Sequence, residues 1–356
     1  MGGFARGSLE VLLPPILAVV ATMILFACFL AAQGVDPIAA YRLVWLGAFG
    51  TWFSWQDSLV RSAPLLLTGL CVALPAQMGL MIIGGEGAFV LGALAAVAAG
   101  LALAGSGLPD VVVQVAMGCA GICAGGAVIA LCGLLRFKRG VNETISSLLF
   151  AYIAIAVMNQ IISGPMRDPG SLNRPATRTL PDNLMLGNIP GTTVHVGLIF
   201  GVVACLAAYV CVYFTKFGFA ARIVGGNARA GRVVGLPVER MILAFCFAAG
   251  GAAGLGGMVE VAAVQGAVSS DISTGAGYTG ILVAFLARMN PLAIIPVSIL
   301  LGGLDAAGGL LQQRLNLPDA TMLVLRGVLF VMLLSAEAFQ GRLARFLAPR
   351  RLPVTV

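Results

Sequence analysis

Charged residues are scarce in this sequence. They occupy 10% of its 356 positions, against roughly 25% in an average soluble domain. Hydrophobic residues occupy 60%, and the mean hydropathy is +1.01. Apolar windows of about 20 residues, long enough to cross the hydrocarbon of a bilayer, recur along the whole chain. A soluble domain is therefore excluded, and the sequence predicts an all-α polytopic membrane protein in contact with the lipid bilayer.

Histidine is limited to one residue, His195, and no two of the eight cysteines have C-x-x-C spacing. Zinc sites and disulfide frameworks need such groupings. We therefore expect no metal and no cofactor in this chain, and we interpret the cysteines as packing residues. His195 has no nearby nucleophile in the sequence, so no catalytic residue is predicted. An intramembrane enzyme is the least favoured class of function.

Lysine is limited to Lys138 and Lys216. A phosphate-binding P-loop requires Gly-Lys-Ser/Thr, and here the preceding residues are Phe137 and Thr215. We therefore expect no ATP hydrolysis by this chain through a P-loop. The net charge of +7 comes from arginines between apolar segments. Basic residues in such places mark cytoplasmic loops, so no nucleic acid is expected as a partner.

Ten membrane segments are predicted from the apolar runs. Basic clusters follow the fourth, sixth and last segments, and Arg6 precedes the first. The positive-inside rule places these clusters and both chain termini in the cytoplasm. The predicted segments are 11–33, 59–81, 86–105, 112–135, 144–163, 195–215, 242–264, 278–290, 292–312 and 321–338.

The connecting segments belong to one predicted transmembrane domain, residues 1–356. A proline-rich outer loop at 164–194 is expected either to dock a partner or to serve only as a connection. The arginine-rich inner segment 216–241 is longer than a simple turn requires, and a basic tail at 339–356 closes the chain. The stretch 41–55 holds all three tryptophans, which predicts an interfacial helix or an aromatic-anchored loop on the outer face.

Glu86 is the only charged residue between Ala63 and Gly107. A carboxylate at the centre of a spanning helix costs about 2.5–3.5 kcal/mol on insertion scales. Two interpretations remain open for the glycines around it. They either form a wetted turn, or they interrupt a helix so that Glu86 lies at the positive N-terminal end of the next piece. The second interpretation assigns a solute pathway to Gly84, Gly85, Glu86 and Gly87.

A second polar group begins the segment at 144–163. Asn142 and Glu143 are expected to act as a helix N-cap with an acid in the first turn, as pathway residues, or as both.

A further break is predicted after 278–290, which is too short to cross the membrane and ends at Asn290, before Pro291. Glu260 and Asp305 are isolated acids in the neighbouring segments. Each either faces a polar pathway or pairs with an arginine such as Arg326.

Five stretches together resemble motifs of one permease group, the permeases of ABC importers for simple sugars and nucleosides. This group belongs to the broad class that includes the branched-chain amino acid permeases. The resemblance extends from about Pro64 to Ala338, and the third stretch is similar to the nucleoside-type branch. The stretches are GGEGAF (84–89), GVNETISSLLFAYIA (140–154), GPMRDPG (164–170), GGNARAGRVVGL (225–236) and GILVAFLARMNPL (280–292).

This resemblance implies an ABC importer permease fold in a bacterial cytoplasmic (inner) membrane. It implies a cytoplasmic ATPase that uses ATP and magnesium, a second permease subunit of different sequence, and an extracytoplasmic solute-binding protein. The solute would be a nucleoside, a nucleobase or a simple sugar, and the chain itself would not be an enzyme. The residues at the matching ATPase-coupling positions are Arg222, Gly226, Asn227, Arg229, Arg232 and Gly235.

The chain departs from the family pattern at four positions. Ile82, Ala88 and Ala151 replace polar residues, and Arg229 stands where an acid is expected. The three missing polar side chains leave open a solute with fewer hydroxyl groups than a nucleoside. The alternative function is an ion- or proton-coupled secondary transporter that uses Glu86, Glu260 and Asp305 as its relay.

Overall fold

The computed structural model describes the backbone of residues 2–171, 174–273, 275–318 and 320–347, and the side chains from 16 to 336 within these ranges. The side chains of Arg6 and of the predicted basic tail at 339–356 lie outside this part. The described residues form helices and two isolated bridges, with no strand among them. The predicted all-α class is therefore confirmed. The chain forms two compact units, residues up to 51 with those from 304 onward, and residues 52–303.

Unit 1 brings the two ends of the sequence together. Its elements are α1 (Gly2–Ala32), α2 (Pro37–Trp45), the π-helical turn η1 (Leu46–Gly50), the later part of α12 (Pro291–Leu315), and α13 (Ala320–Leu347). Asp36 caps α2 by accepting the N–H of Ile38 at 2.9 Å, as expected for an acidic N-cap. The core of this unit consists of Phe26, Leu30, Ala40, Leu311, Leu317, Met322 and Leu325.

Unit 2 holds most of the helices. They are α3 (Trp52–Ala76), α4 (Gly85–Leu103), α5 (Asp110–Arg139), α6 (Glu143–Ser163), η2 (Asp182–Leu184), α7 (Gly197–Phe214), α8 (Lys216–Gly226), α9 (Ala228–Val233), α10 (Val238–Glu260), the π-helical turn η3 (Val261–Gln265), η4 (Ser270–Ile272), α11 (Ala276–Leu286) and the first part of α12.

Three of these helices, α4, α5 and α10, meet through glycine. A Cβ atom added to Gly254 of α10 would lie 2.1 Å from the carbonyl oxygen of Gly121 on α5, and one added to Gly92 of α4 would lie 2.3 Å from the Cα of Gly254. A Cβ on Gly125 would lie 2.4 Å from the oxygen of Gly250. Small residues let helix backbones approach this closely. The van der Waals contacts that result stabilise helix association in a bilayer, where no hydrophobic driving force acts between helices. These three helices are named here the glycine-packed bundle.

Seven helices of the described part of the chain are long and apolar enough to cross a membrane: α3, α4, α5, α6, α7, α10 with η3, and α12. The predicted segments 11–33 and 321–338 correspond to α1 and α13, whose described apolar parts are shorter. The predicted segment 278–290 corresponds to α11, which has 11 residues. A count of ten spanning helices is thus not confirmed.

Two predicted boundaries differ from the structure. The aromatic stretch 41–55 is not one helix, because it is divided among α2, η1 and the start of α3. Helix α3 begins at Trp52 rather than at 59, and its first turns carry Gln56, Asp57 and Arg61. Hydropathy alone does not place such polar turns inside a helix.

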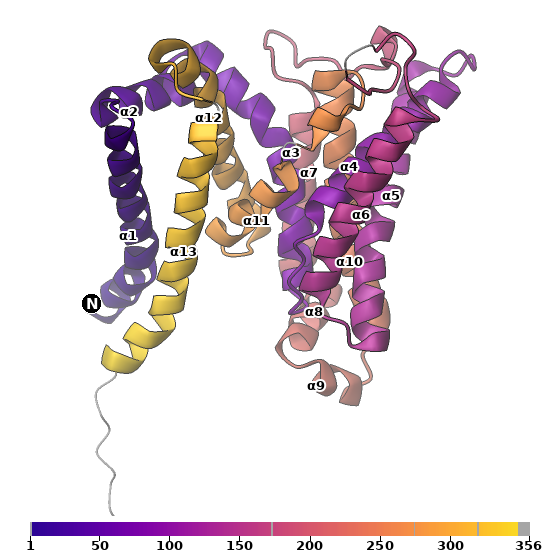
Figure 1. The fold of residues 1–356 in the computed structure, drawn as a ribbon. Coiled ribbons are helices and arrows are strands. Elements are labelled where there is room, and N and C mark those ends of the chain that lie inside the picture. The colour runs from indigo at the N-terminus through magenta and orange to yellow at the C-terminus, as the bar shows by residue number, and fades with distance from the viewer. Residues whose placement is uncertain (1, 172–173, 274, 319, 348–356) are drawn as a thin grey trace, which may run out of the picture. The chain divides into compact units, whose positions relative to one another are not determined.

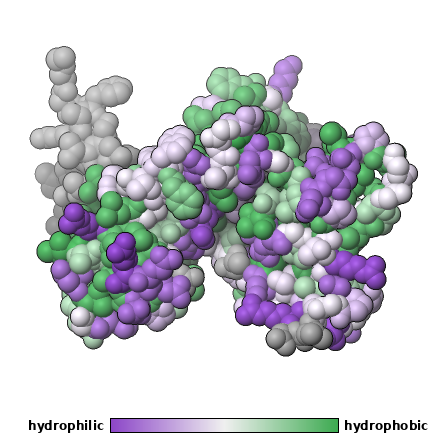
Figure 2. Space-filling view, turned by 90° about the horizontal axis from the view of Figure 1, so that it is seen from above, coloured by the Kyte–Doolittle hydropathy of each residue, from purple (hydrophilic) through white to green (hydrophobic). Residues whose placement is uncertain are grey.

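Unit 2 has two opposite ends (Figure 1). The 164–194 loop lies at one of them, named here the loop end, and α8 and α9 lie at the other, named the α9 end. Figure 2 views the molecule from above, and hydrophilic side chains are spread over this face among apolar ones. The outer loop and the inner arginine-rich segment predicted from the sequence are thus at opposite ends of the unit.

Candidate functional site

Glu86 lies in the first turn of α4 and is 0% exposed. Its carboxylate accepts three hydrogen bonds, from the Ser273 hydroxyl at 3.0 Å, the Gly275 N–H at 3.0 Å and the Gly277 N–H at 2.7 Å. The last two donors are backbone groups at the start of α11, where N–H groups have no partner within the helix. Glu86 therefore caps α11 and is enclosed rather than wetted.

The glycines around Glu86 allow backbones to meet where no side chain has room. A Cβ on Gly277 would lie 2.2 Å from the backbone nitrogen of Glu86, and one on Gly84 would lie 2.3 Å from the oxygen of Ser147 on α6. A Cβ on Gly87 would lie 2.6 Å from the Cα of Ala151. The start of α4 is thus packed between α11 and α6. Ala151, one of the departures from the family pattern, is buried in this contact, where a larger polar side chain would separate the helices.

Helix α3 holds the same end of α11. The Thr68 hydroxyl donates to the Ala276 carbonyl at 3.1 Å and is also within 3.0 Å of the Pro64 carbonyl. A Cβ on Gly280 would lie 2.7 Å from the backbone of Thr68. The N-terminal turn of α11 is consequently fixed by Glu86 on one side and by Thr68 on the other.

The opposite end of α11 contains the break predicted at Asn290–Pro291. Helix α11 ends at Leu286 and α12 begins at Pro291. Between them, Arg288 and Met289 have left-handed φ values of 51° and 56°, which are uncommon for residues other than glycine. The Asn290 side chain accepts the N–H of Leu292 at 3.0 Å and so caps α12. Asn290 therefore begins α12, and its side-chain oxygen is occupied in this role.

Asn142 and Glu143 act as the predicted cap of α6. The Asn142 side chain accepts the N–H groups of Thr144 at 2.9 Å and Ile145 at 3.3 Å. The Glu143 carboxylate pairs with Arg136 at 3.1 Å. Asn142 thus caps α6, and Glu143 pairs with Arg136. Among the described residues around them, neither side chain makes a further contact that indicates a solute pathway.

The remaining acids have partners on other elements. Glu260 accepts the side-chain amide of Gln265 at 3.1 Å, and Asp305 of α12 pairs with Arg326 of α13 within unit 1. The predicted pairing of Asp305 with Arg326 is therefore present. Glu86, Glu260 and Asp305 belong to three separate sets of contacts, and the structure does not join them into a relay.

The segment expected to contact an ATPase forms two short helices at the α9 end. Asn227 caps α9 by accepting the N–H groups of Arg229 at 2.9 Å and Ala230 at 3.1 Å. The bend after α9 uses Gly235 with φ +82°. Val233 and Val234 are 84% and 73% exposed, so an apolar patch lies beside Arg229 at the tip of this segment.

Two arginines attach these short helices to the longer ones. Arg222 lies 5.3 Å from the ring centre of Tyr213 on α7, and Arg232 lies 5.3 Å from that of Phe137 on α5. Gly226 is the last residue of α8, and a Cβ there would meet no atom within 4 Å. All six residues predicted for coupling therefore belong to, or directly flank, α8 and α9.

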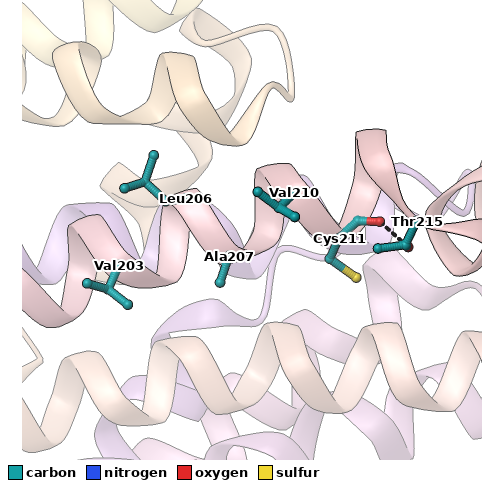
Figure 3. A pocket seen from close by; sticks show the side chains of 6 residues that line it. All are labelled: Val203, Leu206, Ala207, Val210, Cys211 and Thr215. Carbon is teal, nitrogen blue, oxygen red and sulfur yellow. Dashed lines mark hydrogen bonds between the residues drawn. The ribbon is translucent and has the colours of Figure 1, made fainter.

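A hollow of about 490 Å³ lies on α7 (Figure 3). Its one polar hydroxyl, Thr215, donates to the Cys211 carbonyl at 2.5 Å. The lining is otherwise apolar and offers few hydrogen-bond partners to a hydroxylated solute. The hollow is lined by Val203, Leu206, Ala207, Val210, Cys211 and Thr215.

No group of three metal-ligating side chains occurs among the described residues. His195 lies at the loop end, is 2% exposed, and belongs to no such group among the described residues. Burial lowers the pKa of its imidazole below the ordinary value, because an apolar environment disfavours the charged form. Burial therefore favours the neutral form of this side chain.

Several residues that hold α11 were not among the site residues predicted from the sequence. Thr68, Gln77, Ser273 and Gly277 make these contacts through single hydroxyl, amide or backbone groups. One signal was available in the sequence. The stretch 273–280 contains small and hydroxyl residues with glycine at every second or third position, a composition that permits close backbone approach.

The family model for the permease component of branched-chain amino acid transport systems matches residues 54–334. The glucose ABC transporter permease protein TsgB13 of Haloferax volcanii is 32% identical to this chain, and the match covers 92% of this chain and 88% of that protein. The guanosine ABC transporter permease protein NupP of Bacillus subtilis is 27% identical, with 92% and 94% covered. The nucleoside ABC transporter permease protein NupB of Lactococcus lactis is 26% identical, with 89% of each chain covered.

These matches confirm the resemblance derived from the five sequence motifs. They also confirm that the chain is a transport subunit and not an enzyme, since ATP hydrolysis in this family resides in a separate partner. The chain belongs to the family of ABC transporter permeases that serves simple sugars and nucleosides.

Proposed function

We propose that this chain is the membrane-spanning subunit of an ATP-driven importer for a nucleoside or a related small solute, such as a nucleobase or a simple sugar. The observation that carries the proposal is the α9 end, where Val233 and Val234 are exposed beside Arg229. An apolar patch with a basic border suits a protein partner, and the family supplies that partner as an ATPase. The relatives named for glucose, guanosine and nucleosides bound the range of solutes.

The proposal fixes an orientation. The α9 end, with the segment 216–241, faces the cytoplasm and its ATPase, as the positive-inside rule favours. The loop end then faces outward, where the 164–194 loop meets an extracytoplasmic solute-binding protein. Both chain termini are cytoplasmic, and a second permease subunit of different sequence completes the pore in the bacterial inner membrane.

Transport in this proposal is alternating access without any chemical change in the solute. ATP binding favours one of two states of the assembly, and its differential affinity for the two states supplies the driving free energy. The proposed pathway passes the junction of α4 and α11 at the Gly84–Gly87 stretch. The polar atoms at this junction bond to one another in the structure, which is consistent with a closed gate.

The secondary-transporter alternative receives no support from the contacts. An ion relay requires acids that exchange a proton or cation through shared or neighbouring positions, and Glu86 and Glu260 instead bind partners on separate elements.

Reconstitution tests the proposal. Proteoliposomes that contain the chain, its ATPase, the second permease subunit and the binding protein are loaded with ATP or with a non-hydrolysable analogue. Uptake of labelled guanosine, adenine and glucose is then measured with and without an ionophore that dissipates the proton gradient. We expect uptake of one solute class that requires hydrolysable ATP and is insensitive to the ionophore. Uptake that the chain supports alone on a proton gradient would contradict the proposal.

A further inference from the structure

Gln77 links two segments that are far apart in the sequence. It follows α3, in a turn closed by hydrogen bonds from Gly79 N–H to the Ala76 carbonyl and from Leu80 N–H to the Pro75 carbonyl. From this turn its side-chain amide donates to the Met289 carbonyl at 3.0 Å. Met289 is one of the two left-handed residues between α11 and α12. The amide thus holds the carbonyl of a residue whose backbone conformation is intrinsically disfavoured.

The other face of the same turn is pressed against α8. A Cβ on Gly225, near the end of α8, would lie 2.2 Å from the carbonyl oxygen of Gln77. A Cβ on Gly79, which has φ +73°, would lie 2.9 Å from the oxygen of Gly225. Backbones this close have no freedom to slide independently, because any shift of α8 toward the turn meets the repulsive wall of the contact.

The far end of α11 is tied to the loop end. The Thr177 N–H donates to the Val268 carbonyl at 2.9 Å, and the Leu180 N–H donates to the Gly266 carbonyl at 2.8 Å. These bonds attach the 164–194 loop to the segment that leads into Gly275, and Gly275 donates to Glu86. Helix α11 therefore has one end connected to the outer loop and the other end connected, through Gln77, to α8.

We propose that Gln77 is a positioning residue that transmits movement of α8 and α9 to the C-terminal end of α11 during transport. The inference rests on the proposed function, since it assumes that an ATPase moves α8 and α9. The turn receives displacement through the Gly225 contact, and the Gln77 amide passes it to the Met289 carbonyl. The left-handed pair at 288–289 then acts as the hinge between α11 and α12.

A purely structural role for Gln77 makes a different prediction. If the amide only satisfies a buried carbonyl, its loss lowers the stability of the chain, and the amount of assembled transporter, its ATPase activity and its uptake all fall together. If the amide transmits movement, the assembled transporter keeps its basal ATPase activity while ATP hydrolysis becomes disconnected from uptake.

The chain offers a matched control. Gln114 on α5 also donates its side-chain amide to a backbone carbonyl, that of Met185, at 3.1 Å. This bond has the same chemistry as that of Gln77 and is likewise partly buried, but it lies at the loop end and does not touch α8. Methionine has nearly the shape of glutamine without its donor, so Gln77→Met and Gln114→Met remove comparable bonds.

The experiment compares the two variants in the complete reconstituted transporter. The measurements are basal ATPase activity, its stimulation by solute-loaded binding protein, and the solute imported per ATP hydrolysed. For Gln77→Met we expect an unchanged basal rate and about a fivefold loss of solute imported per ATP, the factor that corresponds to one ordinary hydrogen bond. For Gln114→Met we expect the basal rate and the solute imported per ATP to match the unsubstituted transporter.

A second substitution reaches the same turn from the other side. Gly225→Ala places a methyl group against Gln77 and should also reduce solute imported per ATP, and combining it with Gln77→Met should be no worse than the more severe single change. Should Gln77→Met fail to assemble, Gln77→Asn, which keeps an amide on a shorter arm, gives the same readouts.

Three outcomes are decisive. An unchanged ratio of solute to ATP in the Gln77 variants overturns the inference, and so does a parallel fall of assembly, ATPase activity and uptake. Absence of ATP-dependent uptake in the unsubstituted transporter instead refutes the proposed function, which separates the two failures.

Discussion

The glycine-packed bundle and α11 lie within one unit, yet different interactions hold them. The bundle of α4, α5 and α10 relies on backbone-to-backbone contact at Gly92, Gly121 and Gly254. Helix α11 also makes close backbone contacts at Gly277 and Gly280, but it is short, and directed hydrogen bonds fix its ends, to Glu86 at one end and from Gln77 at the other. Close backbone contacts leave little room for a shift, whereas a hydrogen bond can be exchanged for another. The first region suits a frame, and the second suits a moving part.

The largest expected effect would come from breaking the frame. In Gly254→Ala, the new methyl carbon would lie 2.1 Å from the Gly121 oxygen, and we expect a loss of about 3 kcal/mol in stability or a failure to assemble. The matched control is Gly309→Ala, because this glycine is also helical and a Cβ there meets no atom within 4 Å. Thermal unfolding in detergent, followed by size-exclusion chromatography, compares the two. Equal behaviour of the two variants would contradict the idea of a rigid frame.

A smaller effect on stability, with a large effect on transport, is expected at the cap of α11. Glu86→Gln keeps one acceptor oxygen and replaces the other with an NH2 group that opposes the N–H of either Gly275 or Gly277, so stability should fall by about 1–3 kcal/mol. Amide hydrogen exchange should increase in α11 but not in α10, and uptake should be abolished in an assembled transporter. Glu260→Gln is the control, since its carboxylate accepts the Gln265 amide outside α11. Unimpaired uptake in Glu86→Gln would remove α11 from the transport cycle.

The smallest effect is expected at the surface of the loop end. Arg174 pairs with Asp271, and their side chains are 76% and 62% exposed. Pairs of this kind contribute about 0–1 kcal/mol, so Arg174→Ala should leave the unfolding temperature nearly unchanged. Because Asp271 precedes the cap of α11, the variant also tests whether the loop or the glycine contacts support the unit. A loss of stability as large as that of Gly254→Ala would mean that the loop, rather than the glycine contacts, supports the unit.

The bundle was largely predictable from the sequence, and the site was predictable only in part. Long apolar runs gave α4, α5, α6, α7 and α10 to within a few residues, because a spanning helix must satisfy its own backbone in lipid. The break after 278–290 followed from the proline rule. The division into two units was not foreseen, since it depends on contacts between the two ends of the chain.

The partners of Glu86 could not be derived from the sequence. Its isolation among glycines left open a wetted turn or a helix N-terminus nearby, and the helix that it caps is about 190 residues away in the chain. Asn142 and Asn290 were predictable as helix ends, because an N-cap acts within three residues. Gln77 gave no signal, since a single glutamine after a spanning helix is common and its acceptor, the Met289 carbonyl, is a backbone group present in every residue.

The pairing of Asp305 with Arg326 bears on how the chain enters the bilayer. Each charge alone would cost about 2.5–3.5 kcal/mol in the centre of a membrane, and the two lie on consecutive helices, α12 and α13. A hairpin that leaves the translocon as one piece carries no net charge from this pair into the lipid. During synthesis, α12 would then wait beside the translocon until α13 has emerged from the ribosome.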